Sequence, residues 1–107
     1  MPDVDHETWL LDEGDQIFEQ EAAKGYSSLS PRARLIYCVW AADYGMRNAG
    51  DLTTAADLHP TFLVDGQSAA KELGLPATAA AFSLTAEELE DQYFELFDEI
   101  VAEIRAA

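Results

Sequence analysis

The fold is decided by residues 30–50, which read SPRARLIYCVWAADYGMRNAG. Ser30 is a favourable helix N-cap. Pro31 costs no hydrogen bond at the first helical position, because the first amide groups of a helix lack internal partners. The apolar residues that follow occupy most of the helix circumference, and Gly50 then provides a left-handed stop. We therefore predict a central, buried helix near residues 31–48.

Helical patterns flank this segment on both sides. Apolar residues recur at helical spacing over residues 4–24, with Gly14 as a place where that helix could break. A second pattern covers residues 62–73 and ends at Gly74. A short helix capped by Asp51 is expected just before this second pattern.

The last helix has the clearest start signal. Thr85 and Glu88 stand at the spacing of a capping box, in which each side chain accepts a hydrogen bond from the backbone amide of the other residue. Leu84 and Leu89 occupy the positions of a hydrophobic staple beside this cap. Apolar residues at helical spacing then predict a helix over residues 86–104.

Strand patterns are weak by comparison. Residues 61–64 satisfy one such pattern, but no second segment is available to pair with them. Residues 77–82 add one or two helical turns, and the chain contains no repeat or linker. We predict that residues 1–107 form a single all-α domain, a compact bundle of four to six helices.

The charge balance is the strongest compositional signal. Asp and Glu together number 21 and Lys and Arg number 6, which gives a net charge of -15. A chain of this charge repels nucleic acid and anionic membranes, and it attracts basic surfaces. High negative charge also serves solubility, and a salt-loving source would favour a similar composition. Solubility and adaptation to high salt are therefore the alternatives to a basic partner.

Other features of the composition bear on location. No apolar run approaches the roughly 18 residues needed to span a bilayer. The N-terminus carries Asp where a signal peptide would carry Lys or Arg. Cys38 is the only cysteine and cannot form an internal disulfide, which suits a reducing compartment. We expect a cytoplasmic protein that does not bind membranes.

Catalytic and metal-binding patterns are scarce in this chain. His6 and His59 have no second His or Cys at ligand spacing, which argues against a zinc site. Cys38 lies in the most apolar segment and is expected to be a core residue. No phosphate-binding loop, nucleophile elbow or calcium loop is present. We expect neither a cofactor nor an enzyme activity, and the alternative is a carboxylate pair in a pocket near residues 48–51.

The acidic residues concentrate near both ends of the chain. Residues 1–23 and residues 87–103 each contain eight acids, and neither segment contains Lys or Arg. The second segment spans roughly 25 Å as a helix, so its charge density is comparable to the one phosphate per about 3.4 Å of a DNA strand. The candidate binding residues are Glu87, Asp91, Glu95, Asp98, Glu99 and Glu103 in the last helix, and Asp12, Asp15 and Glu19 in the first.

Three segments also resemble a known family. They are GYSSLSP at residues 25–31, LIYCVW at residues 35–40 and YGMRNAG at residues 44–50. Together they are similar to the bacterial DNA-mimic-protein-type domain family of largely unknown function. That family has a leucine-serine or leucine-threonine helix start, an apolar helix and an asparagine-glycine-glycine loop. The resemblance extends over residues 15–105, and Leu73-Gly74 stands where the family ends a later helix.

The resemblance implies a helical fold without known enzyme activity. In one described type of this family, an acidic surface occupies the DNA-binding site of a repressor. Only Asn48 and Gly50 of the family loop carry over, because this chain lacks the glycine, aromatic and glutamine residues that usually follow.

Our leading hypothesis is an acidic module that binds a basic protein surface and mimics DNA to sequester a DNA-binding regulator. The alternative partner is a basic toxin, for which the protein would be an immunity-type or antitoxin inhibitor. In both cases the partner is a protein, and we expect no direct binding of nucleic acid.

Overall fold

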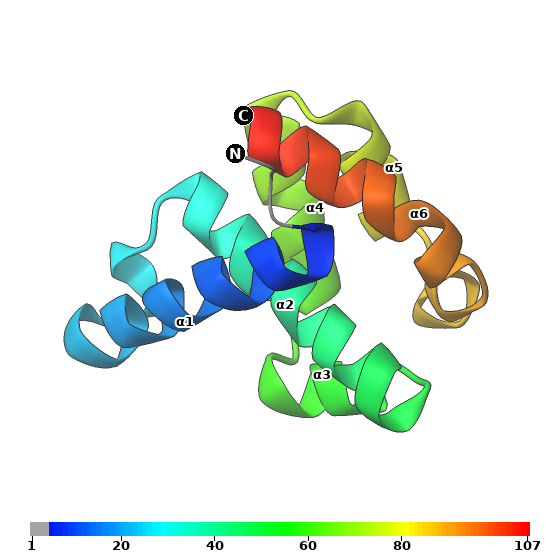
Figure 1. The fold of residues 1–107 in the computed structure, drawn as a ribbon, viewed down its shortest axis with the longest axis horizontal. Coiled ribbons are helices and arrows are strands. Elements are labelled where there is room, and N and C mark those ends of the chain that lie inside the picture. The colour runs from blue at the N-terminus through cyan, green and yellow to red at the C-terminus, as the bar shows by residue number, and fades with distance from the viewer. Residues whose placement is uncertain (1–4) are drawn as a thin grey trace.

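Helix α2 (Pro31–Ala49) runs through the middle of the molecule in the computed structural model, which describes residues 5–107 (Figure 1). Nine of its 19 residues are buried. The other elements pack around it, so the predicted buried central helix is confirmed. The helices in contact with it are α1 (His6–Lys24), α3 (Thr53–Leu58), α4 (Phe62–Leu73) and α6 (Ala86–Ala106).

The described part of the chain contains six α-helices, one short 3-10 turn and no strand. The remaining elements are η1 (Tyr26–Ser28), which joins α1 to α2, and α5 (Pro76–Phe82), which lies between α4 and α6. The predicted all-α bundle of four to six helices is therefore confirmed. The weak strand pattern at residues 61–64 does not form a strand, because Phe62 begins α4, and the predicted helix over residues 62–73 is confirmed. The Cα radius of gyration is 12.7 Å, close to the roughly 13 Å expected for about 100 residues.

The helix ends follow the capping chemistry of the sequence. The Ser30 hydroxyl accepts a hydrogen bond from the Ala33 amide at 3.2 Å, and Gly50 ends α2 with φ 75°. At α6, the Thr85 hydroxyl accepts from the Glu88 amide at 3.1 Å, and the Glu88 carboxylate accepts from the Thr85 amide at 3.0 Å. Both predicted helix starts are confirmed. The caps form because amide groups at the start of a helix have no hydrogen-bond partner inside the helix.

Two details of the predicted helices need correction. Helix α1 is continuous through Gly14, and its predicted start at residue 4 lies outside the described residues. The N-cap position of α3 is Leu52 rather than Asp51, although the Asp51 carboxylate still accepts a hydrogen bond from the Thr53 amide at 3.0 Å.

Gly14 allows α1 to lie close to α2. A Cβ atom at this position would collide with the indole ring of Trp40. That ring cannot move aside freely, because Phe18 packs edge-on against it with centroids 4.5 Å apart and Tyr44 stacks on it at 5.2 Å. The glycine that looks like a helix breaker in the sequence is therefore a contact point between two helices.

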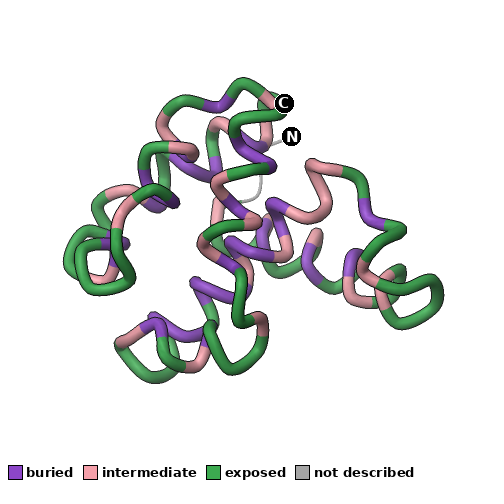
Figure 2. Tube along the Cα trace, turned by 180° about the vertical axis from the view of Figure 1, so that it is seen from behind, coloured by how far each residue is buried: buried purple, intermediate pink, exposed green. Residues whose placement is uncertain are grey.

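The core is one continuous cluster centred on α2. Figure 2 shows buried positions gathered along the inner helices, with exposed positions at the outer turns. No helix in residues 5–107 is long and apolar enough to cross a membrane. The buried residues that α6 contributes are Leu89, Tyr93, Phe97, Ile100, Val101 and Ile104.

Gly14→Ala tests the close contact between α1 and α2. In an exposed helix this change would stabilise by about 1 kcal/mol through helix propensity. Here we expect a net loss of about 1–3 kcal/mol, because the added methyl group overpacks the contact with Trp40. Urea unfolding measures the difference, and Ala22→Gly at an exposed position of α1 calibrates the propensity effect. A Gly14→Ala variant that is more stable than the wild type would contradict this assignment.

Candidate functional site

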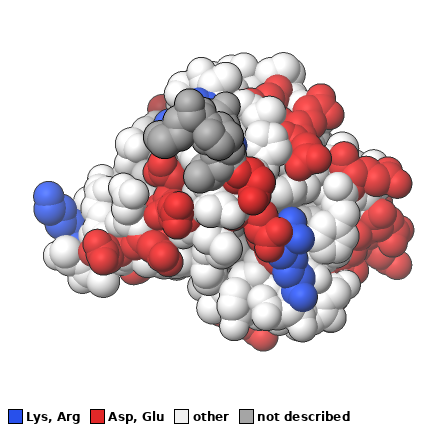
Figure 3. Space-filling view, in the orientation of Figure 1, with Lys and Arg blue, Asp and Glu red and all other residues white. Residues whose placement is uncertain are grey.

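Five carboxylates form an exposed row on α6. We call the side chains of Glu87, Asp91, Glu95, Asp98 and Glu99 the α6 acidic row. All five residues are exposed. Within the described residues, none of these five side chains takes part in a hydrogen bond or an ion pair. The three ion pairs there involve Glu7, Asp43 and Asp65. Figure 3 shows acidic side chains along this helix on the right of the molecule.

Glu103, the last residue predicted for this row, has a different role. Its carboxylate accepts hydrogen bonds from the Ala77 amide at 3.0 Å, the Thr78 amide at 2.7 Å and the Thr78 hydroxyl at 2.7 Å. It therefore caps the N-terminus of α5 and does not present its charge to solvent like a phosphate. The prediction fails because four residues turn a helix by about 400°. A row at that spacing drifts by about 40° per step, and by Glu103 it has turned away from Glu87.

The electrostatics of Glu103 agree with this capping role. Burial opposes its ionisation, but the hydrogen bonds from Thr78 and Ala77 outweigh burial and hold the pKa of the carboxyl below its ordinary value. The amide groups at a helix N-terminus favour a negative charge there. Glu103 consequently fixes α6 against α5 and needs to be ionised to do so.

Glu103→Gln tests the cap between α6 and α5. We expect a loss of about 1 kcal/mol near neutral pH, because an amide group replaces one acceptor oxygen opposite backbone donors. Folding lowers the pKa of Glu103 from its ordinary value of 4.5. Its contribution to the free energy of unfolding is therefore present above pH 4.5 and is lost as the pH falls through the folded-state pKa. The stability difference should therefore shrink in acid. Glu99→Gln is the matched control, and equal effects of the two substitutions would overturn the assignment.

Two more acids of α6 also have structural roles. Glu88 belongs to the capping box, and the hydrogen bonds from Thr85 lower its pKa. The Glu90 carboxylate accepts a hydrogen bond from the Leu52 amide at 2.8 Å, just before α3. Of the eight acids predicted as one charged segment, three therefore bind backbone amides and five remain in the α6 acidic row.

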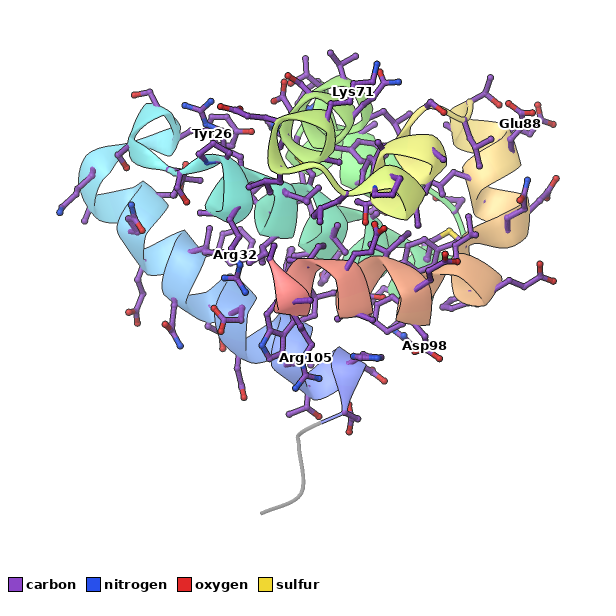
Figure 4. All side chains as sticks on the ribbon, turned by 90° about the horizontal axis from the view of Figure 1, so that it is seen from above. Tyr26, Arg32, Lys71, Glu88, Asp98 and Arg105 are labelled. Atoms are coloured by element: carbon purple, nitrogen blue, oxygen red, sulfur yellow. The ribbon has the colours of Figure 1, made fainter. Side chains whose placement is uncertain are left out.

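The predicted acids of α1 lie on a helix that diverges from α6. Asp12, Asp15 and Glu19 are exposed, as predicted. Helices α1 and α6 meet only where α1 begins and α6 ends, and from there they run to opposite sides of the molecule (Figures 1 and 4). At this junction the guanidinium groups of Arg32 and Arg105 both lie over the ring of Trp9, at 5.6 and 5.5 Å. Arginine and aromatic side chains thus occupy the place where the two acidic helices meet.

The two residues carried over from the family loop serve the end of α2. The Gly50 amide donates to the carbonyl groups of Gly45 and Met46, and the side-chain amide of Asn48 donates to the Tyr44 carbonyl at 2.8 Å. Both contacts satisfy carbonyl groups in the last turns of the helix. Asn48 and Gly50 therefore serve to end α2.

A buried polar cluster was missed in the sequence. Asp43 is only 3% exposed, and both of its carboxylate oxygens accept from Nε of Arg47, at 2.9 and 3.0 Å. The Tyr93 hydroxyl donates to the same carboxylate at 2.7 Å across a separation of 50 residues. A buried charge needs such partners to be tolerated. The available sequence signal was an acid within the most apolar helix, four residues before an arginine.

This cluster lies beside a groove between α1 and α2. The groove has a volume of about 270 Å³ and is lined by Glu7, Leu11, Trp40, Asp43, Tyr44, Arg47 and Asn48. Glu7 lies 3.7 Å from the Arg47 guanidinium. The alternative of a carboxylate pair in a pocket near residues 48–51 leads to this groove. Its sheltered carboxylate is Asp43, and the oxygens of Asp43 are already engaged by Arg47 and Tyr93.

Tyr93→Phe tests how the buried carboxylate is satisfied. We expect a loss of about 1–3 kcal/mol, because Asp43 keeps only Arg47 as a partner. Burial, reinforced by Asp43, raises the pKa of the Tyr93 phenol above 10.0. Its contribution is therefore present below pH 10 and is lost as the pH rises further, so the wild type and variant should converge in alkali. Tyr44→Phe removes an exposed hydroxyl as a control, and an equal effect would refute the role of Tyr93.

A second polar cluster joins η1 to the start of α4. One carboxylate oxygen of Asp65 contacts the Tyr26 hydroxyl at 3.1 Å, His59 Nε2 at 2.8 Å and the Thr61 hydroxyl at 3.0 Å. Burial opposes the ionisation of Asp65, but these hydrogen bonds lower its pKa.

Burial raises the pKa of the nearby Cys38 thiol to about 12, which keeps it protonated at neutral pH.

No group of three or more His, Cys, Asp or Glu side chains in residues 5–107 is arranged to hold a metal ion. Comparison with protein-family models, with curated proteins and with solved structures finds no match to this chain. The resemblance to the DNA-mimic-protein-type domain family therefore stays a prediction that rests on the quoted segments.

Proposed function

We propose that this protein is an acidic binding module whose α6 acidic row engages a basic surface on a partner protein and competes with DNA for that surface. The observation that carries the proposal is that all five carboxylates of the row are exposed and have no intramolecular partner in the described chain. The sequence motifs shared with the DNA-mimic-protein-type family support the same choice.

The charge density of the row is close to that of a nucleic-acid strand. The 13 residues from Glu87 to Glu99 span roughly 20 Å, or about one charge per 4 Å, against about one phosphate per 3.4 Å of a DNA strand. The row is thus slightly sparser than a strand after the three capping acids are removed. It remains dense enough to attract a surface that binds phosphates.

The row also carries a strain that a basic partner would relieve. Glu87, Asp91, Glu95 and Glu99 follow one another at intervals of four residues, and like charges at this spacing destabilise a helix by roughly 0.2–0.5 kcal/mol per pair. The packed face of α6 and its capping box hold the helix in place despite this repulsion. Binding of Lys or Arg side chains would replace the repulsion with attraction.

Neutralising the row tests the proposal. The variant carries Glu87→Gln, Asp91→Asn, Glu95→Gln, Asp98→Asn and Glu99→Gln. The matched control neutralises five acids elsewhere, by Asp12→Asn, Glu19→Gln, Glu21→Gln, Asp57→Asn and Glu72→Gln, so that both variants have the same net charge. Each protein is immobilised and exposed to lysate of the native host, and bound proteins are eluted with a salt gradient or with duplex DNA.

We expect the wild type and the control to retain a basic protein that duplex DNA displaces, and the α6 variant to lose it. The α6 variant should also melt at a higher temperature at low salt, because three like-charge pairs are removed, and this gain should shrink as salt screens the charges. Equal retention by all three proteins would refute the proposal, as would retention by none. A protein that resists both salt and DNA would favour an inhibitor of a basic toxin instead.

A further inference from the structure

Two exposed apolar side chains line one groove, and a third lies against the arginine at its edge. Five large apolar residues are exposed in the described chain, and three of them are Leu11 (46% exposed), Tyr44 (43%) and Phe94 (54%). Leu11 and Tyr44 line the groove beside Arg47, and the Arg47 guanidinium lies 5.3 Å from the centre of the Phe94 ring. Helices α1, α2 and α6 thus each supply one member of this set, which we call the apolar triad.

Carboxylates flank the triad along both outer helices. On α1, Glu7 and Asp15 stand four residues before and after Leu11. On α6, Asp91 and Asp98 stand three residues before and four residues after Phe94. Residues at these spacings are neighbours on a helix surface, and all four acids are exposed. In Figure 4, Asp98 projects to the side on which the first half of α1 lies.

The groove is large enough to take a side chain. Its volume of about 270 Å³ lies at the small end of typical small-molecule pockets, which measure roughly 300–1,000 Å³. One wall is the stacked pair of Trp40 and Tyr44, with ring planes 17° apart, which gives a flat apolar face.

The arginine beside the groove does not repel a basic partner. The Arg47 guanidinium is balanced by the buried carboxylate of Asp43 and faces Glu7 at 3.7 Å. Two carboxylates of the lining thus stand against one guanidinium, and the exposed acids one helical turn from Leu11 and Phe94 add further negative charge nearby. The groove is consequently apolar at its base and negative at its edge.

We infer that the apolar triad is the docking site for a basic amphipathic segment of the partner, with aliphatic side chains at helical spacing between Lys and Arg residues. An aliphatic side chain fits the groove between Leu11 and Tyr44, and its basic neighbours meet the carboxylates at the rim. Recognition of an amphipathic helix by such anchors is a recurrent binding mode, and exposed apolar patches rimmed by charge are typical of interaction sites. The inference rests on the proposed function and adds a specific recognition element to it.

Two synthetic peptides test the inference directly. Both contain only Leu, Lys and Ala over about 18 residues, or roughly five helical turns. One places Leu on a single helical face, and the other is a scrambled sequence of the same composition. Neither peptide fluoresces, and Trp9→Phe leaves Trp40 as the only tryptophan of the protein. Binding is followed by the emission of Trp40, which lines the groove.

We expect the amphipathic peptide to bind about tenfold more tightly than the scrambled one and to shift the Trp40 emission to shorter wavelength. Leu11→Ser with Phe94→Ser should abolish this preference. Leu58→Ser with Val64→Ser, at two other exposed apolar positions, should preserve it. Circular dichroism melting checks that each variant is folded. Equal affinity for the two peptides, or an equal effect of the two double variants, would overturn the inference.

Neutralising the α6 acidic row separates this inference from the proposed function. If the row attracts basic partners, neutralisation weakens both peptides together. Loss of affinity for both, without any preference for the amphipathic peptide, leaves the proposed function standing and overturns the docking site. A persistent preference with no effect of neutralisation overturns the role of the row, Asp91 and Asp98 included, and supports the apolar part of the docking site.

Discussion

The structure depends on burying α2 on nearly all sides. A helix with nine buried residues among 19 needs neighbours around most of its circumference, and close approach requires small residues at the contacts. Gly14 gives α1 access to Trp40. Gly45 gives the start of α3 access to α2, since a Cβ there would lie 2.8 Å from the Asp51 carbonyl oxygen. The outer helices pack one face against α2, and their other faces form the surface of the protein.

Burial of α2 also explains why the polar clusters exist. Asp43 faces the interior, where an unpaired carboxylate would be costly, so Arg47 and Tyr93 converge on it from α2 and α6. The same contacts bring Arg47 beside Phe94 and form one edge of the groove against α1. The residues that satisfy the buried Asp43 carboxylate therefore also form part of the groove at the surface.

The acids of α6 divide into two groups for geometric reasons. Glu88, Glu90 and Glu103 lie where backbone amides of α6, α3 and α5 are unpaired, and they become caps. The residues of the α6 acidic row lie on the outward face, where no donor is within reach. The proposed binding surface thus consists of the α6 carboxylates that do not cap a helix within the fold.

Local rules were sufficient for the helices. Ser30, Gly50 and the Thr85–Glu88 capping box mark ends that depend only on neighbouring residues, and the apolar periodicity identified α2 and α6 as packed helices. The sequence by itself therefore determined the two ends of α2, the start of α6, the buried central helix and the net charge. Only the tertiary structure decided that Gly14 is a contact, that Glu103 is a cap, that α1 and α6 run to opposite sides of the molecule, and that Leu11 and Tyr44 line a groove whose arginine contacts Phe94. These features depend on the relative orientation of helices, which arises from packing between residues far apart in the chain.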